Sequence, residues 1–108
     1  MPQIKVRGLE IEKVKGISKE LVDCLEEIIE CPRDYFTIEC IPSIYIMDGK
    51  TVENFPLIEV AWFDRGQEIQ DGAAEAITQI IQGIGYENVE IFFTVLEKNK
   101  YYENGKHF

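Results

Sequence analysis

A repeat of about 53 residues is the feature that most constrains how this 108-residue chain can fold. Residues 2–7, Pro-Gln-Ile-Lys-Val-Arg, match residues 56–61, Pro-Leu-Ile-Glu-Val-Ala, at an offset of 54. Two further pairs of segments match at offsets of 52 and 53, namely 27–30 with 79–82 and 35–38 with 88–91. Because three successive segments keep nearly the same offset, the sequence indicates one structural unit that is used twice.

Hydrophobic spacing predicts that the first unit is a strand, a helix and a second strand. Residues 2–7 alternate between apolar and polar, which is typical of a strand with one buried face. From Ile11 the apolar residues recur at three- and four-residue steps, which predicts an amphipathic helix of about 20 residues ending at Cys31-Pro32. Tyr35 to Met47 then reads as extended chain, interrupted at Pro42 and followed by a hairpin turn at Asp48-Gly49.

The second unit repeats this order. Pro56 to Phe63 is predicted to be a strand, and a helix follows Asp64-Arg65-Gly66 and runs to about Ile84, with Gly85 as its stop. Val89 to Leu96 is the last predicted strand. We therefore expect a single α/β domain of the α+β type over residues 1–108, with a four-stranded sheet and two helices on one face. The units span about 2–47 and 56–96, and a polar, aromatic-containing tail spans 97–108.

The net charge of −9 limits the classes of partner. Such a charge argues against nucleic acid and anionic membrane surfaces, because both would be repelled. No apolar run approaches the ~20 residues of a membrane span. The first residues lack the apolar stretch of a signal peptide, so the cytoplasm is the expected location. A small anion could bind only where several cations converge, which draws attention to the three arginines, Arg7, Arg33 and Arg65.

Neither the cysteines nor the acidic residues form a pattern that holds a metal. Cys24, Cys31 and Cys40 fall outside metal and redox spacings and are expected to be reduced thiols. The single histidine, His107, lies next to the C-terminus. The acidic face of the first helix is read as a solvated surface. The sequence thus predicts neither a metal nor a cofactor.

Two β-α-β units with a proline at position 2 resemble the tautomerase superfamily, which includes 4-oxalocrotonate tautomerase and macrophage migration inhibitory factor. Four features carry the resemblance. Pro2 opens the first strand, and Pro56 opens the equivalent strand. Asp64-Arg65-Gly66 joins strand to helix where superfamily enzymes keep a substrate-binding arginine, and Cys31-Pro32-Arg33-Asp34 is similar to the family's helix-to-strand connection. Where the family often has a second arginine, this chain has Thr37 or Glu39, and Glu90, so the likeness is to a poorly characterised branch.

The resemblance implies proton transfer by an N-terminal proline. A secondary amine in an apolar pocket has a lowered pKa and can act as a general base near neutral pH. Pro2 would be that base, and it would act on a small anionic keto or enol acid without a cofactor. One condition applies. With Met1 attached, the nitrogen of Pro2 is an amide without basicity, so Met1 must be removed.

Several other residues are candidates for the same site. Arg65 is the favoured group to hold a substrate carboxylate, because it lies between a strand and a helix N-terminus. An ion pair with Asp64 or Glu68 is the alternative for Arg65. The remaining candidate substrate-binding residues are Arg7, which is on the opposite parity to Pro2 and needs a subunit interface, and the aromatic residues Tyr35, Trp62 and Tyr101. For Arg7 the alternative is an ion pair with an acidic residue. For Tyr35 and Trp62 it is core packing or a subunit contact, and for Tyr101 it is packing of the tail.

Two function classes remain open on the sequence. The first is a homotrimeric, cofactor-independent tautomerase, in which the trimer is implied by the resemblance. The second is a non-catalytic oligomeric binding module of ferredoxin-like or tautomerase fold. The state of Met1 is the observation that separates them most simply.

Overall fold

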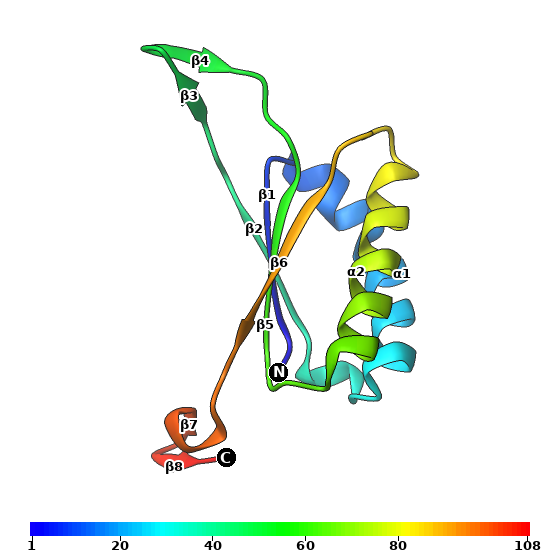
Figure 1. Cartoon of the computed structure of the whole chain (residues 1–108), viewed down its shortest axis with the longest axis vertical. Helices are drawn as coiled ribbons and strands as arrows, with labels where there is room; N and C mark the ends of the chain where they lie inside the picture. The colour runs from blue at the N-terminus through cyan, green and yellow to red at the C-terminus, as the bar shows by residue number, and fades with distance from the viewer.

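A four-stranded mixed sheet with both helices on one face forms the body of the protein, as the computed structural model shows (Figure 1). The structure describes all residues 1–108. Neither helix is both long and apolar enough to cross a lipid bilayer. The sheet has the order β2-β1-β5-β6. The helices and the strands of this sheet are β1 (Gln3–Arg7), α1 (Ile11–Ile29), β2 (Thr37–Ile41), β5 (Leu57–Trp62), α2 (Gln67–Gln82) and β6 (Glu90–Val95).

The strand pairing confirms the repeat. β1 pairs in parallel with β2 and β5 pairs in parallel with β6, while the two units meet through antiparallel pairing of β1 with β5. The two prolines have equivalent hydrogen bonds, since the carbonyl of Pro2 accepts from Thr37 N at 3.2 Å and that of Pro56 from Glu90 N at 3.1 Å. Because β1 and β5 are antiparallel, Pro2 and Pro56 lie at opposite ends of the sheet.

Alternation along the strands places one set of side chains under the helices. Ile4 and Val6 of β1, and Ile58, Val60 and Trp62 of β5, are almost fully buried. Apolar residues spaced three or four apart on both helices close over them, which explains why periodicity located α1 and α2. The core residues from the helices include Val14, Ile17, Leu21, Leu25, Ile29, Ala73, Ile77, Ile80 and Ile81.

Two boundaries differ from the sequence prediction, and one interruption agrees with it. The expected extended stretch begins with a 3-10 turn, η1 (Arg33–Tyr35), and β2 starts only at Thr37. Pro42 does interrupt the chain, as predicted, and separates β2 from β3 (Tyr45–Met47). α2 ends at Gln82 rather than near Ile84, because the backbone tightens into i-to-i+3 hydrogen bonds there before Gly85 adopts a φ of +105°.

Two small hairpins extend from opposite ends of the sheet (Figure 1). β3 pairs with β4 (Lys50–Val52) through Asp48 and Gly49, which both have positive φ as a tight hairpin turn requires. The tail forms a 3-10 turn, η2 (Lys98–Lys100), and the hairpin of β7 (Tyr102–Glu103) with β8 (Lys106–His107). The tail is thus folded, and it returns the C-terminus to the end of the sheet where β1 begins.

Candidate functional site

The head of β1 lies where four elements meet. The pairing places the start of β1 beside the start of β2 and the end of β5, and β6 ends next to β5. Pro2 is buried there, with its side chain less than 2% exposed. The nitrogen of Pro2 is acylated by Met1, whose own α-amino group donates a hydrogen bond to the carbonyl of Tyr35 at 3.1 Å. This corner therefore already holds a charged nitrogen at the start of the chain.

The electrostatics of the corner disfavour that charge. Burial is the main cause that lowers the pKa of the Met1 α-amino group below its ordinary value of 8.0, and the positive charge of Arg65 lowers this pKa further. Cys31 and Glu103 act in the opposite direction. The Cys31 thiol lies against the Met1 carbonyl, with Sγ 3.9 Å from the oxygen. An amine at this position is thus poised to lose its proton more readily than an amine in water.

Arg65 is held by backbone carbonyls rather than by acids. Its Nε donates to the carbonyl of Ile29 at 3.4 Å and one Nη donates to that of Phe63 at 3.1 Å. No carboxylate lies within 4.0 Å of the guanidinium, so the ion pair considered for Arg65 is absent, and Asp64 instead accepts from the backbone N of Gly66 at 2.9 Å. The charge of Arg65 therefore stays unneutralised, and its remaining N–H groups can serve a ligand.

A cavity of about 270 Å³ opens between these groups. An adjoining cavity of about 350 Å³ shares Met1, Tyr35 and Phe108 with it and adds Asp34, Thr37 and Glu103. The cavity beside Arg65 is mainly apolar, with cationic nitrogens at its edge. Its lining residues are Met1, Tyr35, Phe63, Arg65, Lys98 and Phe108.

Tyr101 packs against two of the aromatic residues that line this cavity. Its hydroxyl accepts a hydrogen bond from Gln3 Nε2 at 2.9 Å. Its ring packs edge-on against Phe63 and Phe108, with centroids 5.7 and 5.2 Å apart. These contacts attach the C-terminal tail to the head of β1, and they make Tyr101 a residue that positions the cavity wall.

The structure does not bring Arg7 and Trp62 to the cavity. Trp62 is 0% exposed, and its ring packs on Phe93 in the core with a centroid distance of 4.9 Å. Its prediction as a pocket wall is therefore wrong, because Trp62 shares the parity of the buried strand positions. Arg7 lies at the other end of β1 from Pro2, on the face of the sheet away from the helices, 3.8 Å from Glu59. A role for Arg7 at a subunit interface stays a prediction.

Two lining residues, Lys98 and Phe108, were missed by the sequence reasoning. Both belong to the tail, where no periodicity gives the path of the chain. The available signal was the position of Lys98 three residues after β6, since β6 ends beside the strand that leads to Arg65.

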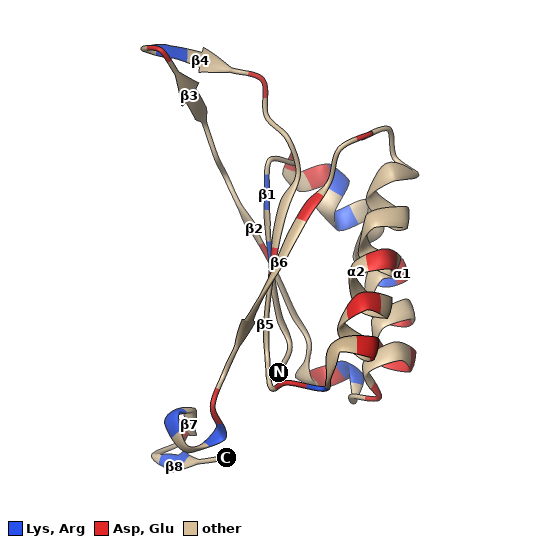
Figure 2. Ribbon diagram, in the orientation of Figure 1, with Lys and Arg blue, Asp and Glu red and all other residues tan.

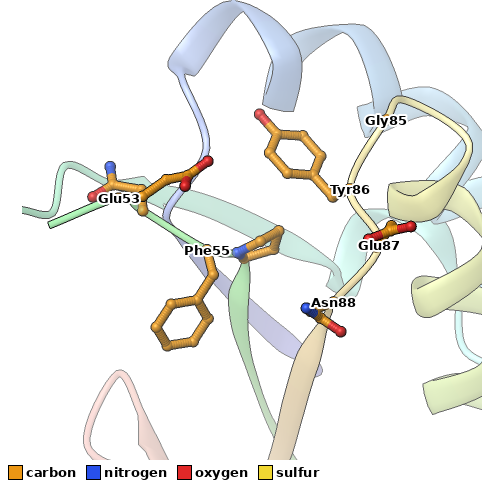
Figure 3. Close-up of a pocket in the computed structure, with 8 residues that line it drawn as sticks. Glu53, Phe55, Gly85, Tyr86, Glu87 and Asn88 are labelled. Carbon is orange, nitrogen blue, oxygen red and sulfur yellow. The ribbon is translucent and has the colours of Figure 1, made fainter.

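A second, larger pocket of about 550 Å³ lies at the opposite end of the sheet, around Pro56 (Figure 3). Glu53 and Glu87 contribute to its rim, and Tyr86 receives a hydrogen bond from Lys13 Nζ at 2.9 Å. The nitrogen of Pro56 is part of the peptide bond to Phe55, so this pocket contains no amine that could act as a base. No group of three or more potential metal-ligating side chains converges anywhere in the chain.

The fold is similar to that of a macrophage migration inhibitory factor-like protein and of a fused 4-OT. The chain belongs to the DUF1904 family, described as a domain of unknown function, whose model matches residues 1–107. The crystal structure of a DUF1904 domain from Sebaldella termitidis ATCC 33386 is 44% identical, with a TM-score of 0.94 and coverage of 100% of both chains.

More distant structures share the fold alone. A macrophage migration inhibitory factor-like protein from Entamoeba histolytica is 21% identical, with a TM-score of 0.75, and the match covers 99% of this chain and 98% of the other. A fused 4-OT described as a wild-type symmetric trimer is 18% identical, with a TM-score of 0.79, and the match covers 98% of this chain and 95% of that chain. No curated protein sequence matches this chain.

Proposed function

We propose that this protein is a cofactor-independent tautomerase of a small 2-keto acid, with Pro2 as acid and base after removal of Met1. One observation supports the proposal: Met1, which covers the buried Pro2, and Arg65, which has no acidic partner, line the same mainly apolar cavity. The burial that lowers the pKa of the Met1 amine would act in the same direction on a Pro2 amine in this corner.

The chemistry needs only groups of the chain. The lone pair of the Pro2 nitrogen takes a proton from the carbon next to the ketone, and the electrons of the C–H bond move to the ketone oxygen as an enolate. Arg65 holds the carboxylate and stabilises the enolate. The protonated Pro2 then returns the proton to another atom of the same molecule, so that the reaction needs no oxidant or external acid.

Intact mass is the first test, because retention of Met1 in the native host would end the proposal. The second test is tautomerisation of phenylenolpyruvate and 2-hydroxymuconate by the processed chain. Pro2→Ala replaces the rigid secondary amine by a flexible primary amine and should lower kcat/KM by about 10²-fold, because a general base depends on its position and pKa. Pro56→Ala is the matched control, because this proline heads the equivalent strand with an acylated nitrogen.

Arg65→Ala tests the anion site, with Arg33→Ala as the control. Arg33 is exposed and paired with Asp23 at 2.6 Å, so its loss should leave the rate unchanged. Equal rates for wild type, Pro2→Ala and Arg65→Ala would refute the mechanism.

A non-catalytic binding module of the same fold is the second candidate, and the position of Met1 favours it. While Met1 is attached, its amine donates a hydrogen bond to the Tyr35 carbonyl and the nitrogen of Pro2 is an amide, so the cavity beside Arg65 can hold a ligand but offers it no proline base. A chain that keeps Met1, binds a keto acid and leaves it unchanged would support this reading.

We also propose that the protein self-associates, with a homotrimer as the expected assembly. The fused 4-OT with this fold is described as a trimer. One face of the sheet carries no helix, and Phe92 of β6 is exposed on it. Further exposed apolar side chains lie in and just before β3, namely Ile44, Ile46 and Met47. Light scattering should give three times the 12.5 kDa of one chain, and a monomer would contradict the proposal.

A further inference from the structure

We propose that Lys98 of the C-terminal tail is a specificity-determining residue that binds a second anionic group of the ligand. The inference deepens the proposed function and rests on it, since it takes the ligand to be a keto acid in the cavity at the head of β1. The tail would then be part of the binding site of its own chain rather than only a support for it.

The two lysines of η2 differ in whether an acidic residue neutralises them. Lys100 lies 2.8 Å from Glu97 and is neutralised within the turn. Lys98 belongs to the same turn, lines the cavity and has no carboxylate within 4.0 Å. The Nζ of Lys98 instead lies over the ring of Phe63, 5.8 Å from its centroid. The side chain is therefore held over the cavity wall with its charge available.

Charge is unevenly distributed over the molecule. The chain has 20 acidic and 11 basic residues, so the molecule as a whole repels anions. Arg65 and Lys98 both face this cavity without an acid partner. Figure 2 shows basic residues in the tail and acidic residues on both helices, with further basic residues on α1. The cavity is a local positive site on an anionic molecule.

The acidic residues of the neighbouring cavity would orient the ligand. Asp34 and Glu103 line the adjoining space but not the space beside Arg65 and Lys98. A ligand with two carboxylates would be repelled by Asp34 and Glu103 in the adjoining cavity and attracted to the space beside Arg65 and Lys98. Two separate cations also suit two separate anionic groups better than one.

The experiment compares two keto acids of equal length, 2-oxoglutarate and 2-oxovalerate, which differ in the second carboxylate. Dissociation constants are measured by NMR titration of the backbone amides of Tyr35, Phe63 and Phe108. Wild type should bind 2-oxoglutarate about two- to fivefold more tightly, as an ion pair with an exposed lysine allows. Lys98→Met should remove this preference without changing 2-oxovalerate, and Lys98→Arg should restore it.

Lys100→Met is the matched control, because the same charge is lost from the same turn at a paired position. Unchanged discrimination in Lys98→Met, an equal effect of Lys100→Met, or absence of binding by wild type would overturn the inference. Exchange of the C3 protons of the bound acid with D₂O reports the proposed chemistry separately. Loss of the Lys98 preference without any C3 exchange would support Lys98 as an anion ligand and refute proton transfer by Pro2.

Discussion

Gly8 and the carbonyl of Phe55 are in such close approach that a Cβ on Gly8 would lie 1.8 Å from the carbonyl oxygen. Gly8 also has a φ of +87°, a conformation that other residues rarely adopt. This contact joins the end of β1 to the segment that leads into β5, and so fixes how the two units meet. Only glycine fits at this position.

Gly8→Ala should therefore lower the free energy of unfolding by about 3 kcal/mol or more, through both steric overlap and backbone strain. Urea denaturation of the variant and wild type measures the loss. The control is Gly16→Ala, which lies within α1 with no atom within 4 Å of the added Cβ. It should stabilise the protein by about 0.5–1 kcal/mol, and a loss of similar size at both positions would contradict the explanation.

Glu30 ends α1 in the left-handed conformation, with φ and ψ of 57° and 55°. Glu30→Gly should raise the free energy of unfolding by about 1 kcal/mol, because glycine adopts this conformation without strain and the negative charge at the helix C-terminus is removed. Thermal unfolding followed by circular dichroism checks the change. Glu27→Gly, one turn earlier and exposed, should instead destabilise the helix by about 1 kcal/mol. Destabilisation by both variants would argue against the strained cap.

The α-amino group of a chain that retains Met1 should make stability depend on pH. Its pKa in the folded protein is below the ordinary value of 8.0, so between these two values the unfolded chain binds more protons. The free energy of unfolding should therefore rise with pH across this window and level off above it. Urea titrations between pH 6 and about 9 measure the slope, since the reference amine titrates in that range.

Arg65→Ala should raise the pKa of the Met1 α-amino group, because the positive charge of Arg65 lowers this pKa in the wild type. The pH dependence of amine labelling at Met1 reports this pKa directly. Arg33→Ala removes an arginine that is already paired with Asp23, and it should leave the pKa of the Met1 amine unchanged. An unchanged pKa in Arg65→Ala would show that Arg65 does not act on the head of β1.

Trp62 gives a test of the boundary between the core and the cavity. As the only tryptophan, and one that is fully buried, it should show fluorescence that iodide quenches weakly in the folded protein and strongly in urea. Trp62→Ala should cost about 3–5 kcal/mol, as expected for a large core side chain. Tyr35→Ala, at an exposed aromatic of the cavity, should change stability by only about 0.5 kcal/mol. Strong quenching in the folded state would place Trp62 at the surface after all.

The parts of the fold that follow from local pattern could be predicted from the sequence. The 54-residue offset between Pro2 and Pro56 predicted the two strands, and apolar spacing predicted both helices. The error at Trp62 was avoidable, since it shares the parity of Ile58 and Val60, which face the helices. Parity along a strand determines the buried face more directly than residue type does.

The cavity itself depends on contacts that no local pattern contains. Arg65 reaches the head of β1 because β5 runs antiparallel to β1, a property of strand order rather than of any segment. Lys98 and Phe108 reach it because the tail turns back through η2 and a hairpin, and Tyr101 then hydrogen-bonds to Gln3. Such long-range returns of the chain become visible only in the folded structure.

The meeting of both termini at one corner also determines how the protein can be handled. Phe108 lines the same cavity as Met1, so a purification tag at either end would start from the walls of this space. A tag ahead of Pro2 would keep its nitrogen acylated, and one after Phe108 would extend from the opposite wall. An inactive tagged preparation would be uninformative about the native chain. Expression without fusion partners, or with a linker that is cleaved to leave Pro2 first, is therefore part of any fair assay.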